Sequence, residues 1–157
     1  MLPAPTTSKK SNDLPNKFEI NAKKFFITYP KVNRRSIWDK DFYLKIFFDF
    51  YKEKFEKELT YAIVAIEEHK DGTPHIHVLA EFKKSKHIRS PRYFDHAYDG
   101  FTWHGNIQSV RNRRATIKYI TKDCCFKSFG ITTDGIERLI QHRSLGESLY
   151  DLKDHAK

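Results

Sequence analysis

Two apolar segments joined by a short polar turn constrain the fold of this chain more than any other feature. Residues 60–67 read TYAIVAIE, residues 74–82 read PHIHVLAEF, and the turn between them contains Asp71-Gly72. Both segments are rich in β-branched and aliphatic residues, which favours strands. Asp-Gly between two such segments is a strong hairpin signal. We therefore predict an antiparallel hairpin here.

The second strand of this hairpin carries two histidines on one face. Residues two apart on a strand point to the same side of a sheet, so His75 and His77 project together. A strand histidine is often purely structural, but imidazole is also the commonest metal ligand. The hairpin brings a carboxylate beside both imidazoles, and such a set can hold a divalent cation with positions left for water or phosphate. The hairpin is therefore a candidate metal site.

The spacing leaves open which carboxylate joins the histidines. A two-residue turn at Asp71-Gly72 would place Glu68 opposite His75, whereas a turn one residue longer or shorter would place Glu67 on the histidine face. Each glutamate continues an apolar face of its strand, so the hydrophobic pattern selects neither.

The first half of the chain supplies one more strand and a helix. Residues 23–29, KKFFITY, predict a strand that Pro30 ends. Residues 38–59 predict an amphipathic helix of about 20 residues, whose start resembles a capping box from Ser36 to Asp39. Its aromatic residues fall at helical spacing and are assigned to the core: Phe47, Phe50, Tyr51 and Phe55.

The second half begins with residues 83–96, which are basic and have an irregular pattern. Residues 101–110 predict one or two short strands, and Asn112 is placed to cap a helix over 113–123. One or two amphipathic helices follow Gly130. Together these elements predict an α+β domain with a central antiparallel sheet of about five strands and flanking helices, an RRM-like arrangement.

Length and composition suit a single intracellular domain that binds a polyanion. The 157 residues carry a formal net charge of +9, which favours nucleic acid as the partner. The two cysteines are adjacent and form no disulfide framework, which indicates a reducing compartment. No apolar run approaches the roughly 20 residues of a membrane span. We expect a disordered arm over 1–16, the domain over 17–125, and a helical extension or linker over 126–157.

A second group of polar residues falls on one helical face. Tyr119, Lys122 and Asp123 are spaced i, i+3 and i+4 on the predicted helix. Such a set is commonly just a solvated face. It also fits a nucleophile, a phosphate-positioning cation and an extra metal carboxylate, because a tyrosine hydroxyl needs activation before it can attack.

Three motifs occur in an order that resembles HUH-type rolling-circle replication initiators: FFITYP (25–30), PHIHVLAEF (74–82) and YITKD (119–123). The segment RYFDHAYDGFTWHGNIQSV (92–110) is similar to an element of geminivirus-like replication proteins (Rep). The resemblance covers roughly residues 20–125 and implies the HUH endonuclease fold, with the histidine strand central and the tyrosine helix packed beneath it.

The resemblance implies a role for each matching residue. Glu67, His75 and His77 would bind a divalent metal, Mg²⁺ or Mn²⁺, and Asp123 would be an additional ligand or support one. Tyr119 would be the nucleophile and Lys122 would orient the phosphate. The candidate DNA-binding residues lie in the first motif, in the Rep-like element and before the tyrosine helix: Phe26, Thr28, Tyr29, Arg92, Asn106, Gln108, Arg111, Arg113 and Arg114.

The expected function is therefore metal-dependent nicking and rejoining of single-stranded DNA at an origin stem-loop, through a 5′-phosphotyrosine. The alternatives are a non-catalytic nucleic-acid-binding module, although no RNP1 pattern occurs, and a structural metal protein. The phosphate-binding loop of a Rep helicase domain is absent from the sequence. The chain is thus expected to be a nuclease fragment of a longer helicase-bearing protein or a small stand-alone initiator, with a homo-oligomer as a further option. The resemblance places it in the nucleus of a eukaryotic host, or otherwise in the cytoplasm.

Overall fold

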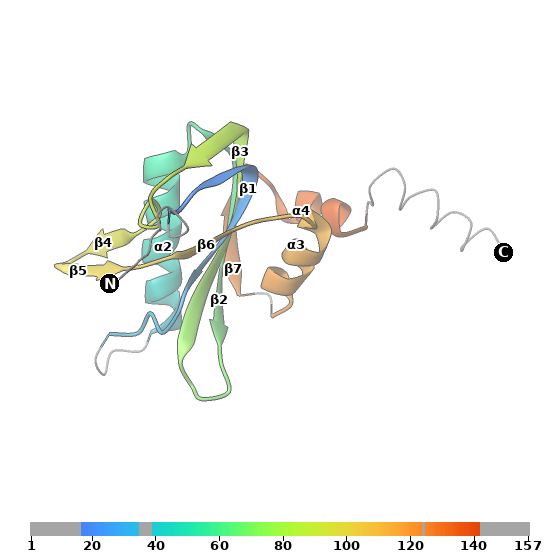
Figure 1. The fold of residues 1–157 in the computed structure, drawn as a ribbon. Coiled ribbons are helices and arrows are strands. Elements are labelled where there is room, and N and C mark those ends of the chain that lie inside the picture. The colour runs from blue at the N-terminus through green and yellow to red at the C-terminus, as the bar shows by residue number, and fades with distance from the viewer. Residues whose placement is uncertain (1–16, 35–38, 124, 142–157) are drawn as a thin grey trace, which may run out of the picture.

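The structure of the chain, a computed structural model, describes residues 17–34, 39–123 and 125–141. It contains a five-stranded sheet with helices on both faces (Figure 1). The sheet strands are β1 (Ile20–Tyr29), β2 (Leu59–Glu68), β3 (Pro74–Ile88), β6 (Asn106–Ser109) and β7 (Phe126–Phe129). The other elements are helices α2 (Lys40–Phe55), α3 (Arg113–Thr121) and α4 (Thr133–Gln141), and a hairpin of β4 (His96–Tyr98) and β5 (Phe101–Trp103).

The strand order in the sheet is β6-β1-β3-β2-β7, and every neighbouring pair is antiparallel. The histidine strand β3 is therefore central, as predicted. This arrangement confirms the α+β class and the sheet of about five strands, and it is the arrangement expected of an HUH endonuclease fold.

The two faces of the sheet bury separate cores. Helix α2 covers one face, where Phe47, Tyr51 and Phe55 are buried as the aromatic spacing predicted. Phe50 is only half-buried and stacks on His96, with 4.2 Å between ring centroids. Helices α3 and α4 cover the other face with a smaller cluster, whose buried residues are Tyr61, Ile63, Ala65, Leu79, Ile117, Ile120 and Ile136.

The β2–β3 register resolves the ambiguity between the two glutamates. Glu67 lies opposite His75, and Glu68 lies opposite Pro74. The connecting loop is longer than a two-residue turn, since the His69 amide donates to the Thr73 carbonyl at 2.9 Å. Gly72 adopts a φ of 85°, a left-handed conformation that glycine tolerates best. The longer loop places Glu67, rather than Glu68, on the histidine face.

Helix α2 is shorter than the predicted 38–59 segment. It begins at Lys40, and Asp39 is its N-cap, because the Asp39 carboxylate accepts from the amides of Asp41 at 3.1 Å and Phe42 at 3.3 Å. The expected capping box placed Asp39 three residues after the N-cap, and this prediction is wrong because Asp39 is itself the N-cap. Ser36 lies outside the described residues. The last predicted residue, Leu59, instead starts β2 and is buried.

Two segments that the sequence did not assign to the sheet belong to it. Residues 83–88, predicted as irregular, continue β3, because Ile88 pairs with Ile20 and is buried although the three residues 83–85 are exposed. The sheet also continues past residue 125, where we expected the domain to end: β7 pairs with β2, with Ala65 opposite Phe126. Helix α4 then packs on α3, so this part of the predicted extension is integral to the fold.

The predictions for residues 1–16 and 142–157 fall outside the described part of the chain. Within that part, the helices are too short or too polar to cross a bilayer.

Candidate active site

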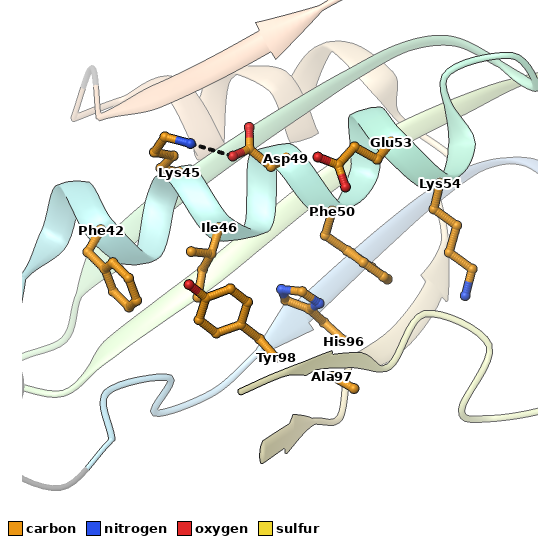
Figure 2. A pocket seen from close by; sticks show the side chains of 10 residues that line it. All are labelled: Phe42, Lys45, Ile46, Asp49, Phe50, Glu53, Lys54, His96, Ala97 and Tyr98. Carbon is orange, nitrogen blue, oxygen red and sulfur yellow. Dashed lines mark hydrogen bonds and ion pairs between the residues drawn. The ribbon is translucent and has the colours of Figure 1, made fainter. Parts of the chain in front are cut away.

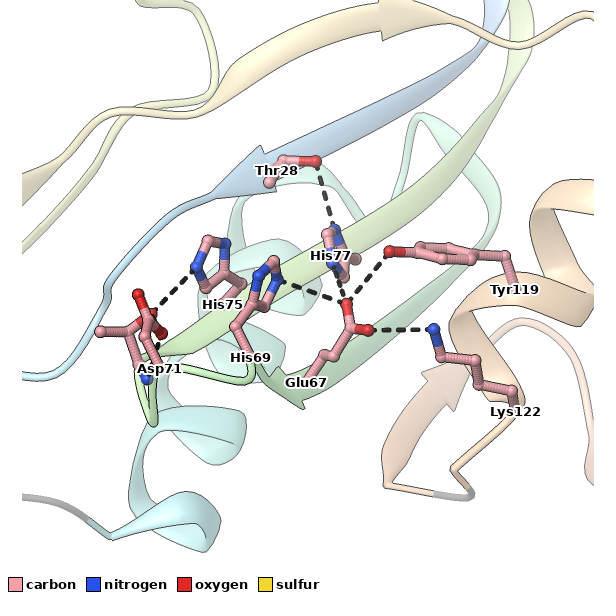
Figure 3. Close-up of polar contacts among 9 residues, drawn as sticks. Thr28, Glu67, His69, Asp71, His75, His77, Tyr119 and Lys122 are labelled. Atoms are coloured by element: carbon pink, nitrogen blue, oxygen red, sulfur yellow. Dashed lines mark hydrogen bonds and ion pairs between the residues drawn. The ribbon is translucent and has the colours of Figure 1, made fainter.

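Four side chains converge on Glu67: His77 from β3, His69 from the β2–β3 loop, and Tyr119 and Lys122 from the end of α3 (Figure 3). The Oε1 atom of Glu67 accepts a hydrogen bond from His77 Nε2 at 2.8 Å and another from the Tyr119 hydroxyl at 3.1 Å. Its Oε2 atom accepts from Lys122 Nζ at 2.9 Å. Helix α3, capped by Asn112 as predicted, brings Tyr119 and Lys122 to the histidine face of the sheet. The two halves predicted from sequence are thus joined through one carboxylate.

These contacts fix the charge state of the carboxylate. Partial burial opposes ionisation of Glu67, but the hydrogen bonds from Lys122, His77 and Tyr119 outweigh it and lower the pKa of Glu67 to about 2. Hydrogen bonding to Glu67 raises the pKa of Lys122 in turn. The centre therefore holds an ionised carboxylate beside a protonated ammonium at neutral pH.

The two predicted histidines are neutral, which is the form that binds metals. Burial lowers the pKa of His77, and this effect exceeds the opposing influence of Glu67. Burial also lowers the pKa of His75. His77 is held in place by Thr28, whose hydroxyl lies 3.2 Å from Nδ1, and by Phe26, whose ring stacks on the imidazole with centroids 5.4 Å apart.

Tyr119 is protonated and accessible. Partial burial, followed by the negative charge of Glu67, raises its pKa. Its side chain is 43% exposed, while its ring lies 5.5 Å from that of His77. An accessible phenol beside imidazoles and a carboxylate is chemically suited to nucleophilic attack only when something stabilises the phenolate.

One group of side chains that could hold a cation overlaps with the predicted ligand set at Glu67 and His77. Within the described residues, the ligand atoms of Glu67, His69 and His77 all lie within 4.8 Å of one another. The predicted ligand His75 is outside this set, because its Nε2 atom is turned toward the Thr73 hydroxyl at 3.4 Å. Asp123 is exposed and also outside it, although its charge acts on Tyr119 and Lys122.

His69 is the residue that sequence reasoning missed. The hairpin pattern assigns it to the turn and gives it no role. One signal was available: it lies two residues after Glu67, the spacing at which strand side chains share a face.

Four predicted DNA-binding residues share the Tyr119 face of the sheet. Asn106 pairs with Thr28, and Gln108 pairs with Phe26, so the strand register puts all four on one surface. A shallow groove of about 310 Å³ lies beside them and is lined by Phe26, Gln108, Ser109, Val110, Arg111, Ala115, Thr116 and Tyr119. Arg111 is exposed at this groove.

Tyr29 does not belong to that surface. It alternates with Thr28 along β1, so it faces the α2 core, where it is fully buried. Its hydroxyl contacts Tyr51 at 2.7 Å and donates to the Phe94 carbonyl. The prediction that Tyr29 contacts DNA is therefore wrong.

Three predicted arginines are engaged within the protein. Arg113 pairs with Glu81 at 3.1 Å, and Arg114 donates to the carbonyl of Ile140. Arg92 pairs with Asp95 at 3.0 Å, although its side chain remains 73% exposed. Arg113 and Arg114 thus support the fold, because they anchor α3 to β3 and α4.

The Rep-like element folds as one unit around Asp95. This carboxylate contacts His104 Nδ1 at 2.7 Å and accepts from the Gly105 amide at 3.3 Å. The two sequence landmarks of the element, Phe94-Asp95 and the HGNIQ segment, are therefore joined in space. Gly105 is required at its position, since an added Cβ would lie 2.5 Å from Ile27.

A larger groove, of about 620 Å³, lies between α2 and β4 on the opposite side of the sheet (Figure 2). Phe42, Phe50 and Tyr98 line it with His96, whose ring is buried. None of the converging groups around Glu67 lines this groove, so it is separate from the candidate active site.

Comparison of the sequence with known proteins identifies the family of this chain. The model of the family "Geminivirus Rep catalytic domain" matches residues 18–131, a range that includes β7. The chain is 35% identical over 112 residues to Replication-associated protein A of Tobacco yellow dwarf virus (strain Australia), covering 68% of this chain and 32% of the relative. It is 36% identical over 114 residues to Replication-associated protein of Bean yellow dwarf virus, covering 72% and 30%. The corresponding protein of Cabbage leaf curl virus (isolate Jamaica) is 34% identical over 111 residues, covering 69% and 30%.

The chain spans about a third of the length of these relatives. Since the family model covers well over half of the chain and the three motifs meet in one site, the chain belongs to the geminivirus Rep catalytic domain family.

Proposed function

We propose that this chain is the catalytic domain of a rolling-circle replication initiator that nicks and rejoins single-stranded DNA at an origin stem-loop. The observation that carries the proposal is the convergence of His77, Tyr119 and Lys122 on Glu67. The convergence supports the proposal because a nucleophile, a phosphate-binding cation and metal-ligating groups would then act from one hydrogen-bonded cluster. Family membership and the names of the viral relatives support the same function.

The donor set fits a divalent cation, because an ionised carboxylate suits both Mn²⁺ and Mg²⁺ and neutral imidazoles can complete the coordination of a transition metal such as Mn²⁺. Glu67 and His77 would hold it, together with the neighbouring histidines. When bound, Mg²⁺ or Mn²⁺ would polarise the scissile phosphate and stabilise charge in the displacement. Thr28 would orient the His77 ring from its second nitrogen, as outer partners of metal-binding histidines do.

The chain's own residues supply the bond-forming step. The Tyr119 hydroxyl forms a bond to phosphorus as the bond from phosphorus to the 3′ oxygen breaks. The phenol loses one proton and the 3′ oxygen gains one, so the reaction is balanced and leaves a free 3′ hydroxyl. Because the phosphotyrosine ester keeps the energy of the broken bond, attack by a 3′ hydroxyl reverses the step and rejoins the strand.

Lys122 would bind the phosphate only after exchanging partners. Its ammonium group lies on Glu67 at 2.9 Å and also above the Tyr119 ring, 4.1 Å from the centroid. A phosphate entering beside Tyr119 would offer a second anionic partner at the same place. The groove that Phe26, Gln108 and Arg111 line leads to Tyr119 and would hold the flanking nucleotides.

The proposal is tested with a single-stranded stem-loop oligonucleotide and Mn²⁺ or Mg²⁺, followed by denaturing electrophoresis. We expect a metal-dependent covalent protein–DNA band from the wild-type chain and none from Tyr119→Phe. Phenylalanine preserves the ring packing on His77 and removes only the hydroxyl.

Measurements of DNA affinity on the same proteins are needed to interpret the adduct assay. Tyr119→Phe should retain DNA affinity, since the aromatic ring that stacks on a base is intact. DNA binding without any adduct from the wild-type chain, across stem-loop sequences, would favour the non-catalytic binding module instead. Cleavage by Tyr119→Phe would show that water, rather than Tyr119, attacks the phosphate.

A further inference from the structure

We propose that His69 is a ligand of the divalent cation, alongside Glu67 and His77, and that it biases the site toward Mn²⁺ over Mg²⁺. The inference rests on the proposed function, because it concerns the metal of the same site. It goes beyond the motif resemblance, which assigns no role to His69.

The distances around Glu67 suit a shared cation. His69 Nε2 lies 3.6 Å from Glu67 Oε1, which is too far for a hydrogen bond, while His77 Nε2 lies 2.8 Å from the same oxygen. Ligands bonded at about 2.1 Å to an octahedral cation lie about 3 Å apart at right angles and about 4.2 Å apart when opposite. The three ligand atoms, all within 4.8 Å of one another, need only small shifts to meet these separations.

The backbone of His69 is held in the position that this role requires. Its amide donates to the Thr73 carbonyl at 2.9 Å, and its carbonyl accepts from the Gly72 amide at 2.8 Å. Within the described residues, no hydrogen bond engages the His69 ring. The ring is therefore presented from a hydrogen-bonded turn, with Nε2 facing the Glu67 carboxylate at 3.6 Å.

His75 uses its Nε2 atom for a different contact. The Thr73 hydroxyl donates to the Asp71 carboxylate at 2.6 Å, so it can only accept from His75 Nε2 at 3.4 Å. This contact places the His75 proton on Nε2 and leaves Nδ1 as the unprotonated nitrogen. His69 stacks on His75 with centroids 3.5 Å apart and planes inclined by 13°, and it lies between His75 and Glu67 (Figure 3).

The ligand type predicts metal preference. Carboxylate and water oxygens suit both Mg²⁺ and Mn²⁺, whereas imidazole nitrogen binds divalent transition metals better than it binds Mg²⁺. A second or third imidazole in the set therefore favours Mn²⁺, and replacement of His69 by an oxygen ligand should reduce that preference.

The test measures Mn²⁺ and Mg²⁺ affinity by titration calorimetry on metal-free protein. We expect His69→Phe, which keeps a ring stacked on His75 but removes both nitrogens, to weaken Mn²⁺ binding by about 10-fold or more, the scale seen even for supporting residues of metal sites. His69→Asp should lower the ratio of Mn²⁺ to Mg²⁺ affinity. The matched control is His87→Phe, the same change on β3 at a side chain that pairs with Glu19, and it should leave both affinities unchanged.

The outcomes separate this inference from the proposed function. If His69→Phe binds Mn²⁺ as tightly as the wild-type chain, or if His69→Asp leaves the metal preference unchanged, His69 is not a ligand. In that case, loss of Mn²⁺ binding in Glu67→Gln would still support the metal-dependent site. If the wild-type chain itself binds neither metal, the metal-dependent function fails together with the role of His69.

Discussion

Glu67→Gln should make stability less dependent on pH, and the structure sets the size of the effect. The substitution keeps the shape of the side chain but removes the charge that Lys122, His77 and Tyr119 stabilise. The pKa of Glu67 falls from its ordinary value of 4.5 to about 2 in the folded chain. Lowering a pKa by one corresponds to about 1.36 kcal/mol, so the whole change gives an upper limit of about 3 kcal/mol.

Solvent screening reduces this value. Lys122 is 43% exposed, so we expect Glu67 to contribute about 2 kcal/mol to the free energy of unfolding at neutral pH. Because the folded pKa is the lower one, this contribution is present above the unfolded pKa and is lost as pH falls toward about 2. The gap in stability between the wild-type chain and Glu67→Gln should therefore narrow steadily below about pH 5.

The assay is urea denaturation in the presence of a chelator at pH 7, 5, 4 and 3. Glu68→Gln is the matched control, because Glu68 is exposed and lies opposite Pro74 rather than a histidine. Its stability should follow that of the wild-type chain at every pH. A gap for Glu67→Gln that stays constant from pH 7 to 3, or an equal response in Glu68→Gln, would refute the account of Glu67.

Three further predictions follow from the same structure. Gly130→Ala should destabilise the fold by more than about 2 kcal/mol in thermal or urea unfolding, because φ is 76° and a Cβ would lie 2.3 Å from the Thr60 carbonyl oxygen; an unchanged midpoint would contradict the described β2–β7 contact. Affinity for single-stranded DNA should fall steeply between 50 and 200 mM salt, and Arg111→Gln should reduce the slope of log K against log salt by about 0.7. Arg113→Gln should instead lower the free energy of unfolding, because the ion pair with Glu81 is lost. Equal salt slopes for the wild-type chain and Arg111→Gln would show that Arg111 does not contact the DNA. Lys122→Ala should slow adduct formation in single-turnover assays without abolishing it, because a positioning charge forms no bond; a complete loss would give Lys122 a role in the chemistry itself.

The hairpin and the histidine face could be predicted because strand periodicity is local. Alternation alone places His75 and His77 on one face of the sheet, whereas the β1–β3 register decides which β1 residues share that face. The same rule, applied to β1, would have excluded Tyr29, which differs from Thr28 by one position and therefore faces the opposite core. Motif matching selected both residues together and overlooked the alternation.

The choice between Glu67 and Glu68 depended on loop length, which the residues left open. The Asp-Gly pair predicts a turn but not how many residues flank it. Backbone hydrogen bonds between His69 and its neighbours lengthen the loop and shift the register by one. His69 was missed for the same reason, since a residue assigned to a turn was not considered for the site.

The positions of the arginines in the sequence could not show which of them are engaged within the protein. Arg111, Arg113 and Arg114 are nearly consecutive, yet Arg113 and Arg114 contact groups 26 to 32 residues away in sequence. Only the packing of α3 against β3 and α4 shows that these two cations are already engaged. The end of β3 was missed for a similar reason. Its lysine-rich sequence predicts irregular structure, but pairing with the distant strand β1 makes it part of the sheet.

The most direct test of the central claim is to locate the covalent bond. After reaction with the stem-loop oligonucleotide, nuclease digestion and trypsin should release the peptide Tyr119–Lys122, which follows Lys118 and ends at Lys122. Tandem mass spectrometry should then assign a nucleotide phosphate to Tyr119. A nucleotide on any other residue, or cleaved DNA with no modified peptide, would contradict the account.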